Sequence, residues 1–351
     1  MVKFSVNHST SFAIAMFGRE EVLKSAKLLE ELGNFDGASI MDHINWYPDY
    51  AKIYSAWIMA TEIAMVTKKL DVGIMVSDVF RTHPVQMAQH ALHLQQVANG
   101  RFILGLGAGE TVNLSPWSIE AEKPVSHLEE AIQVLKLLFE SHPKNKATFE
   151  GKYYNFKKQY LQFPDYAHPK PKIWLAAGSP RTLKITAKYA DGWIPVGCTP
   201  KLYKEQAKIV KSENREIEMA QNTFLSISKD DPEQAKNVAS LAAAVFVMRP
   251  EILSEHGIEM PEKLDFIKHF KFEKVSKHKR HMGHAMEFMN EHVPRDLVLE
   301  TVLAGSPEDI IKQIKKMKDA GCEHFGLQFL GQDFWGSVKM FSEEVIPHVQ
   351  D

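Results

Sequence analysis

The chain has 351 residues, of which 44% are hydrophobic and 25% are charged, and its formal net charge at neutral pH is -2. That balance is typical of a soluble globular protein and gives no electrostatic reason to expect nucleic acid or an anionic membrane as a partner. Two cysteines exclude a disulfide framework, and since signal-peptide and membrane-spanning patterns are also missing, we expect a cytoplasmic protein.

Strand-like and helix-like patterns alternate in the first part of the chain. Between residues 19 and 32, for example, Val22, Ala26 and Leu29 recur at helical spacing, and Gly33 follows as a stop signal. Pro84 suits the first turn of a later helix. We expect strands over 2–6, 38–41, 70–76 and 102–107, and helices over 19–32, 51–67, 84–98 and 125–140.

The segment 141–172 interrupts this alternation with four prolines and an aromatic-rich stretch, so we expect a hairpin and an excursion there. The alternation then resumes. Residues 247–300, which are rich in Lys, His and Met, are interpreted as a second, helical insertion. We expect strands over 173–177, 192–196, 223–227 and 324–329, and helices over 180–189, 200–213, 232–246, 307–320 and 335–345.

Eight strand–helix units predict an α/β fold of the (β/α)8 TIM-barrel type with insertions. We expect residues 1–351 to form a single domain. A doubly wound sheet is the alternative, but eight evenly spaced units favour closure.

The expected second strand ends at Met41-Asp42-His43, with Trp46 and Tyr47 close behind. Barrel strands present their carboxyl ends to ligands, and an imidazole beside a carboxylate is suited to acid–base catalysis. The aromatic ring of Trp46 or Tyr47 would pack against one side of a ring-shaped ligand. A helix-capping Asp42 with a structural His43 is the alternative, and the sequence leaves both interpretations open.

The expected fourth strand ends at the run Gly105 to Glu110, in which glycines alternate with Leu106 and Ala108. A dinucleotide fingerprint requires Gly or Ala where Glu110 stands, so this run does not indicate a Rossmann site. We expect the glycines either to admit a flat ligand or to pack inside the barrel. Because the second and fourth strands share one interior layer, Glu110 is expected to converge with Asp42 and His43 over one mouth of the barrel.

Ala177-Gly178-Ser179 follows the expected fifth strand and opens a helix. Backbone N–H groups and the hydroxyl of Ser179 suit a phosphate, and the alternative is an ordinary helix start. The histidines His278, His281 and His284 have a spacing typical of metal ligands. Their basic neighbours favour a solvated helix face instead, and we expect no metal site.

Beyond the barrel rhythm, five motifs are distinctive: Met41-Asp42-His43, Arg81-Thr82-His83-Pro84, Gly107-Ala108-Gly109-Glu110, Ala176-Ala177-Gly178-Ser179 and Ala190-Asp191-Gly192. They resemble the bacterial-luciferase-like superfamily, and within it the branch that uses coenzyme F420, a deazaflavin. That branch includes secondary alcohol dehydrogenase, glucose-6-phosphate dehydrogenase, phthiodiolone ketoreductase and methylenetetrahydromethanopterin reductase. The resemblance covers nearly the whole chain and is weakest from 245 to 300.

This resemblance implies a homodimeric oxidoreductase that exchanges a hydride between C5 of F420 and a small molecule, either a carbonyl/alcohol pair or an activated C=N or C=C bond. It implies that His43 is the acid–base group on the substrate oxygen, that Glu110 handles protonation near N1 of the deazaflavin, and that Trp46 is a further catalytic residue. The resemblance also implies a non-proline cis peptide bond behind the ring, which here would be Met75–Val76. The implied cofactor-binding residues are Asp42, Met75, Val76, Ala108, Asn113, Ala177, Gly178 and Ser179.

Differences from the family pattern narrow the range of expected substrates. The alcohol and sugar-phosphate enzymes place a Trp where this chain has Tyr47, and the methanopterin reductase has a Glu near the position of Asn7. Glu255 and Glu300 stand where the sugar-phosphate enzyme has cations, so glucose 6-phosphate is not expected to bind. The stretch 105–130 is most similar to the ketoreductase subgroup. An FMN-dependent luciferase-like monooxygenase is the first alternative, and a non-catalytic cofactor-binding protein is the second.

Overall fold

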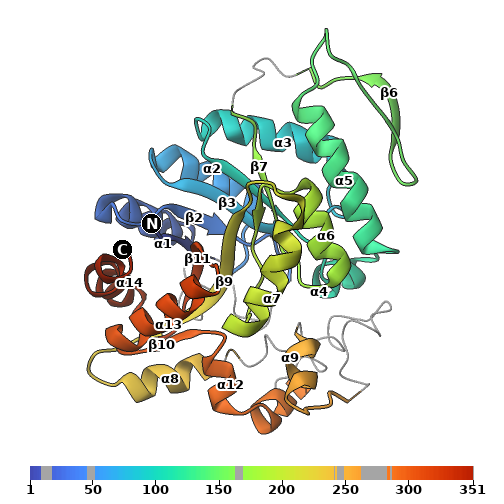
Figure 1. The fold of residues 1–351 in the computed structure, drawn as a ribbon. Coiled ribbons are helices and arrows are strands. Elements are labelled where there is room, and N and C mark those ends of the chain that lie inside the picture. The colour runs from blue at the N-terminus through green and yellow to red at the C-terminus, as the bar shows by residue number, and fades with distance from the viewer. Residues whose placement is uncertain are drawn as a thin grey trace.

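The computed structural model describes residues 1–8, 18–45, 52–162, 169–240, 242, 249–261, 283–284 and 287–350 (Figure 1). Within these ranges, one parallel sheet has nine strands, and eight of them close into a barrel because β8 pairs with β9 and β11 pairs with β1. The predicted TIM barrel is therefore confirmed. The barrel strands are β1 (Lys3–Asn7), β2 (Gly37–Ile40), β3 (Asp71–Ser77), β4 (Phe102–Leu106), β7 (Lys172–Leu175), β8 (Gly192–Trp193), β9 (Glu218–Ile227) and β11 (His324–Phe329).

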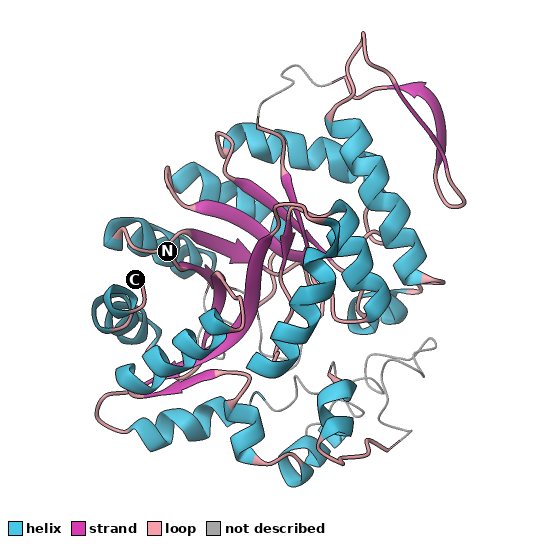
Figure 2. Ribbon diagram, viewed as in Figure 1, coloured by secondary structure: helices cyan, strands magenta, loops and turns pink. Residues whose placement is uncertain are grey.

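Helices surround the sheet on its outside, as Figure 2 shows. Their apolar faces pack on the strands, as expected for parallel strands buried on both sides. The helices are α1 (Arg19–Leu32), α2 (Ala56–Val66), α3 (Pro84–Val97), α4 (Thr111–Leu114), α5 (Pro124–Phe139), α6 (Pro180–Tyr189), α7 (Pro200–Val210), α8 (Pro232–Ser240), α9 (Pro250–Glu255), α12 (Arg295–Leu299), α13 (Pro307–Asp319) and α14 (Phe334–Glu344).

Helix boundaries follow local capping chemistry. Helix α1 has the predicted bounds and ends at Gly33, whose φ of 74° is the left-handed conformation that glycine adopts easily. Helices α6 and α13 each begin with a capping box, in which Ser179 or Ser306 exchanges hydrogen bonds with the residue three positions later.

A hairpin leaves the barrel within the segment 141–172. Its antiparallel strands β5 (Ala147–Glu150) and β6 (Asn155–Gln159) lie beside α5, away from the barrel axis (Figure 1). The carboxylate of Glu130 on α5 accepts hydrogen bonds from the backbone N–H groups of Lys152 and Tyr153, both at 2.8 Å. This carboxylate ties the hairpin tip to the barrel.

Several boundaries differ from the prediction. The expected strand 192–196 ends at Trp193, because Pro195 has no N–H to continue the ladder. Strand β9 starts at Glu218 rather than 223, since its polar first half pairs with neighbours inside the barrel. A short strand beside β9, β10 (Leu303–Gly305), was not predicted.

Two predicted helices also differ from the prediction at one end. The helix expected over 51–67 begins at Ala56, and the one expected over 200–213 ends at Val210 in a short 3-10 turn. The helix expected over 232–246 is described only to Ser240.

The barrel interior changes character along its axis. Its middle is an apolar cluster that contains Met75, Trp174 and Ala220. Its amino end is charged, because Glu218 accepts hydrogen bonds from Lys3 at 2.8 Å and from His324 at 3.0 Å. The opposite, carboxyl end carries the polar residues of the next section.

Candidate functional site

The loops after β2, β3 and β4 bring the first group of predicted site residues together. These strands are neighbours in the sheet, so their carboxyl ends lie side by side at one mouth of the barrel. Asp42 and His43 follow β2, Ser77 ends β3, and Glu110 and Asn113 follow β4. The predicted convergence of Asp42, His43 and Glu110 is thus observed.

His43 and Glu110 form the acid–base pair of this mouth. The Nε2 atom of His43 lies 3.3 Å from Oε2 of Glu110, with the imidazole 7% exposed and the carboxylate 43% exposed. Burial lowers the pKa of His43 below its ordinary value, and the nearby Glu110 carboxylate opposes that shift only in part. The lowered pKa favours the neutral imidazole, the form that accepts a proton.

Asp42 is held by two side chains from the end of β3 and its loop. Ser77 Oγ donates to its carboxylate at 2.5 Å, and the Arg81 guanidinium lies 3.2 Å from the same oxygen. Arg81 Nη2 also donates to the backbone carbonyl of Asp42, while its Nε pairs with Asp78. Asp42 is thus a partly buried, paired carboxylate rather than a helix cap.

Asn113 connects the loops after β2 and β4. Its Oδ1 accepts hydrogen bonds from the backbone N–H groups of Ile44 at 2.8 Å and Asn45 at 3.0 Å. Its Nδ2 donates to Glu110 Oε2 at 3.3 Å, and the residue is only 2% exposed. The amide therefore bonds on one side to the segment after His43 and on the other to the partner of His43.

The peptide bond between Met75 and Val76 is cis, as the family resemblance implied. Strand β4 packs closely against this part of β3, because a Cβ on Gly105 would meet the Ile74 carbonyl at 2.5 Å. Close packing thus explains Gly105. Ala108 is half-buried two residues before Glu110.

The third predicted element, after β7, begins α6. Ala177 is buried, and Ser179 exchanges hydrogen bonds with Thr182, Oγ accepting at 3.3 Å and N–H donating at 3.1 Å. A Cβ on Gly178 would lie 2.5 Å from Nη1 of Arg249. Ser179 is therefore a helix cap, and a buried cation stands beside the loop that was predicted to receive a phosphate.

Arg249 has its own set of partners. It donates to the carbonyl of Val196 and to the thiol of Cys198, both at 2.7 Å, and pairs with Glu251 at 3.1 Å. Burial raises the pKa of the Cys198 thiol to about 11. This thiol is a neutral packing group rather than a nucleophile.

Sequence reasoning assigned no role to three residues of this mouth, Ser77, Arg81 and Arg249. Arg81 belongs to the motif Arg81-Thr82-His83-Pro84, on which the family resemblance partly rests. No other feature of the sequence pointed to a role for Arg81. Trp46 and Tyr47 lie outside the described residues, as do His278 and His281.

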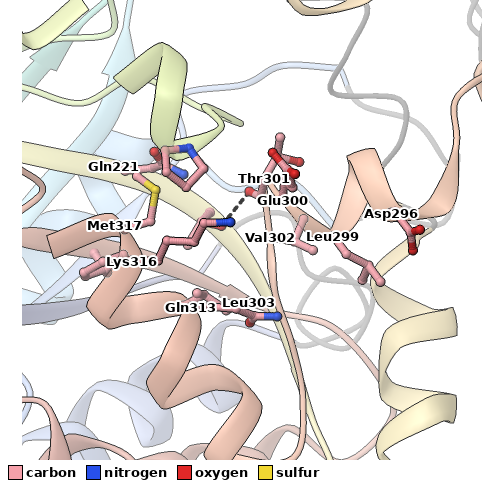
Figure 3. A pocket seen from close by; sticks show the side chains of 13 residues that line it. Gln221, Asp296, Leu299, Glu300, Thr301, Val302, Leu303, Gln313, Lys316 and Met317 are labelled. Carbon is pink, nitrogen blue, oxygen red and sulfur yellow. Dashed lines mark hydrogen bonds between the residues drawn. The ribbon is translucent and has the colours of Figure 1, made fainter. Parts of the chain in front are cut away.

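A cavity of about 230 Å³ lies elsewhere, between β9, β10 and α13 (Figure 3). Gln221 and Thr223 of β9 line it together with Gln313 and Lys316 of α13. Neither His43 nor Glu110 borders it, so it is separate from the acid–base pair.

The described part of the chain has neither a membrane-spanning helix nor a cluster of metal ligands. No helix there is long and apolar enough to cross a membrane. No group of three or more His, Cys, Asp and Glu side chains in those residues is arranged to hold a metal ion.

A family model described as luciferase-like monooxygenase matches residues 3–324. A phthiodiolone/phenolphthiodiolone dimycocerosates ketoreductase of Mycobacterium tuberculosis is 27% identical over 310 residues, covering 85% of this chain and 79% of the relative. A 5,10-methylenetetrahydromethanopterin reductase of Methanopyrus kandleri is 24% identical over 363 residues, covering 97% and 99%.

Among solved structures, an F420-dependent secondary alcohol dehydrogenase in complex with an F420–acetone adduct is similar, with a TM-score of 0.78 and 23% identity. The similarity covers 100% of this chain and 99% of that one. At this identity the likeness establishes a shared fold.

Proposed function

This chain belongs to the luciferase-like monooxygenase family and is an oxidoreductase, and we propose that it uses coenzyme F420 to interconvert a carbonyl and an alcohol. Reduction of an activated C=N or C=C bond is the related reaction of the same class. The observation that carries the proposal is the contact between the buried His43, whose pKa is lowered, and Glu110 at the carboxyl end of the barrel. The F420-linked name of a structural relative supports the choice of cofactor.

The described residues fit a deazaflavin that carries a phosphate. Gly178 stands next to the N-terminus of α6, and the Arg249 cation lies against that glycine. A helix N-terminus with a neighbouring guanidinium suits an anion. We propose that Ala177, Gly178 and Ser179 hold the phosphate, and that Asp42, Met75, Val76, Ala108 and Asn113 border the ring system.

When bound, F420 would supply the site that exchanges a hydride with the substrate carbon. The side chains of the protein transfer the proton. In the oxidation direction the His43 imidazole takes the proton of the substrate hydroxyl, while Nε2, which faces the Glu110 carboxylate, carries the proton of the neutral ring. Glu110 stabilises the resulting imidazolium, because its negative carboxylate raises the pKa of His43 and so offsets part of the effect of burial. In the reduction direction the imidazolium returns a proton to the substrate oxygen.

Fluorescence titration of the purified protein with F420, with FMN in parallel, tests this proposal. Tight binding of F420 and weak binding of FMN supports it, and alcohols, ketones and imines are then screened by the change in deazaflavin absorbance. Preference for FMN contradicts it.

An FMN-dependent monooxygenase is the second candidate, because the family model that matches the chain carries a monooxygenase description. Oxygen uptake with added reduced FMN separates the two candidates. The paired His43 and Glu110 favour the first, since they provide a proton relay for a carbonyl/alcohol reaction.

We further propose that residues 1–351 form one barrel domain with insertions at about 141–172 and 247–300, and that two copies associate. Helix α2 supports association because two apolar side chains on one of its faces, Ile58 and Met65, are 64% and 73% exposed. Both buried cysteines, Cys198 and Cys322, are free thiols, which suits the reducing cytoplasm that we propose as the location.

A further inference from the structure

The short segment that carries His43 is held from both sides. Before His43, Arg81 contacts the backbone carbonyl and the carboxylate of Asp42. After His43, Asn113 accepts hydrogen bonds from the next two backbone N–H groups, those of Ile44 and Asn45. His43 thus lies between two anchors that follow different strands, Arg81 after β3 and Asn113 after β4.

We propose that Arg81 and Asn113 are positioning residues that clamp the segment 42–45 from opposite ends and so hold the His43 imidazole against Glu110. This rests on the proposed function only in assigning His43 and Glu110 to acid–base work. The clamp itself is a property of the protein without cofactor.

Arg81 is suited to its end of the clamp by the shape of the guanidinium. One edge of the planar group meets Asp42, at both the carbonyl and the carboxylate, while Nε meets Asp78. Asp78 in turn accepts the backbone N–H groups of Phe80 and Arg81, at 2.9 and 3.0 Å, which fixes the loop from which Arg81 reaches. A lysine keeps the charge but cannot make this set of contacts at once.

Asn113 joins the two members of the acid–base pair. Its Oδ1 holds the backbone after His43 and its Nδ2 holds the Glu110 carboxylate. The resemblance gave Asn113 a cofactor contact. In the structure its oxygen and its nitrogen also bond to protein groups and its side chain is buried, so the clamp is a second role beside the proposed position next to the ring system.

The residues of the clamp also contribute to the charge around the His43 imidazole and so to its pKa. Four charged groups act on His43: the carboxylates of Glu110, Asp42 and Asp78, which raise its pKa, and the Arg81 cation, which lowers it together with burial. Removal of the Arg81 charge therefore favours the imidazolium. A residue with a purely structural role would not change this titration.

The test measures the His43 titration by NMR of the imidazole nitrogens in the protein without cofactor, with the signal assigned by its loss in His43→Gln. In Arg81→Met the His43 pKa is expected to rise, while in Arg81→Lys it stays near the wild-type value because the charge remains. In both variants kcat is expected to fall about tenfold to a hundredfold, since the geometry of the base is lost.

Asn113 is tested with a matched pair. Asn113→Asp keeps an acceptor for Ile44 and Asn45 but replaces the donor to Glu110 by an anion, so the His43 pKa is expected to rise. Asn113→Leu removes both contacts, and kcat is expected to fall with little change in the KM for substrate.

Thermal unfolding of each variant shows whether it folds. Ser77→Ala, which removes one neutral donor to Asp42, is the milder variant if Arg81 proves essential for folding, and it is expected to lower kcat without moving the His43 pKa. An unchanged His43 titration in Arg81→Met or Asn113→Asp contradicts the proposal. Because the titration needs no cofactor, that result is independent of whether F420 or FMN binds.

Discussion

Gly178 and Arg249 lie so close together that a methyl group on Gly178 would meet the guanidinium Nη1 at 2.5 Å. This contact joins the loop before α6 to the start of the segment that leads into α9. The absence of a side chain at residue 178 thus determines where a buried positive charge can lie.

Gly178→Ala is expected to weaken F420 binding about tenfold, because the new Cβ displaces Arg249 from the proposed phosphate site. The same deazaflavin without its phosphate side chain should lose much less affinity. Fluorescence titration measures both. Gly283→Ala is the control, since a Cβ there meets nothing within 4 Å. Equal losses for the two ligands would show that residue 178 does not act through the phosphate.

His43→Ala is expected to abolish turnover while cofactor binding is largely kept, because the imidazole transfers the proton and does not hold the cofactor. Single-turnover bleaching of the deazaflavin and a binding titration measure the two properties separately. Turnover at the wild-type rate would remove His43 from the mechanism.

Glu110→Gln is expected to move the acidic limb of the kcat profile for alcohol oxidation to lower pH. In this direction His43 must be neutral, and its pKa is already lowered by burial and raised again by the Glu110 carboxylate. Without that anion the pKa falls further, so the base stays neutral at lower pH. A shift of the limb to higher pH, or none, would separate Glu110 from the titration of His43.

Glu218 is expected to make folding stability depend on pH in the acid range. Burial alone would raise its pKa, but hydrogen bonds from His324 and Lys3 lower it from 4.5 to about 2. A carboxyl whose pKa is lowered on folding stabilises the protein above pH 4.5, and this stability is lost as the pH falls toward 2.

The contribution is about 3 kcal/mol at neutral pH, from about 1.4 kcal/mol for each pKa unit. Chemical denaturation between pH 2 and pH 6 measures it, with Glu218→Gln as the comparison. In that variant the acid-dependent loss of unfolding free energy should be smaller by this amount. Parallel curves for the two proteins would contradict the assignment.

Met65→Glu is expected to shift the protein toward monomers in sedimentation velocity experiments. The residue is 73% exposed on α2 beside Ile58, and a carboxylate buried against a second copy would lack a partner. Leu137→Glu, on α5, adds the same charge at another exposed apolar position and serves as the control. A wild-type protein that sediments as a monomer would rule out this interface.

The sequence was sufficient for elements with strong local signals. Segments 19–32, 180–189 and 324–329 have the predicted bounds, because capping residues or a dense apolar run mark them. Strand β9 was predicted five residues too short, since Glu218 and Asn222 look polar in sequence and their partners come from distant strands. Short β10 carries too few residues for a periodic pattern.

The residues of the candidate site likewise include some that the sequence predicted and some that it did not. Asp42, His43 and Glu110 follow recognisable strand ends, so barrel topology alone predicted that they meet. Arg81 and Arg249 act through contacts with loops that are remote in sequence, and no local pattern encodes such a contact. The use of Asn113 as a bridge depends on the packing of two loops, which only the structure shows.

Closure of the barrel joins the two ends of the chain. Ser5 Oγ on β1 lies 2.9 Å from His324 Nε2 on β11, a hydrogen bond between residues 319 positions apart. During synthesis, β1 leaves the ribosome early, but its neighbour on this side is made near the end. The nascent chain therefore carries an open sheet edge for most of its translation, and a product that stops before β11 retains unpaired edges at β1 and β9 that favour aggregation.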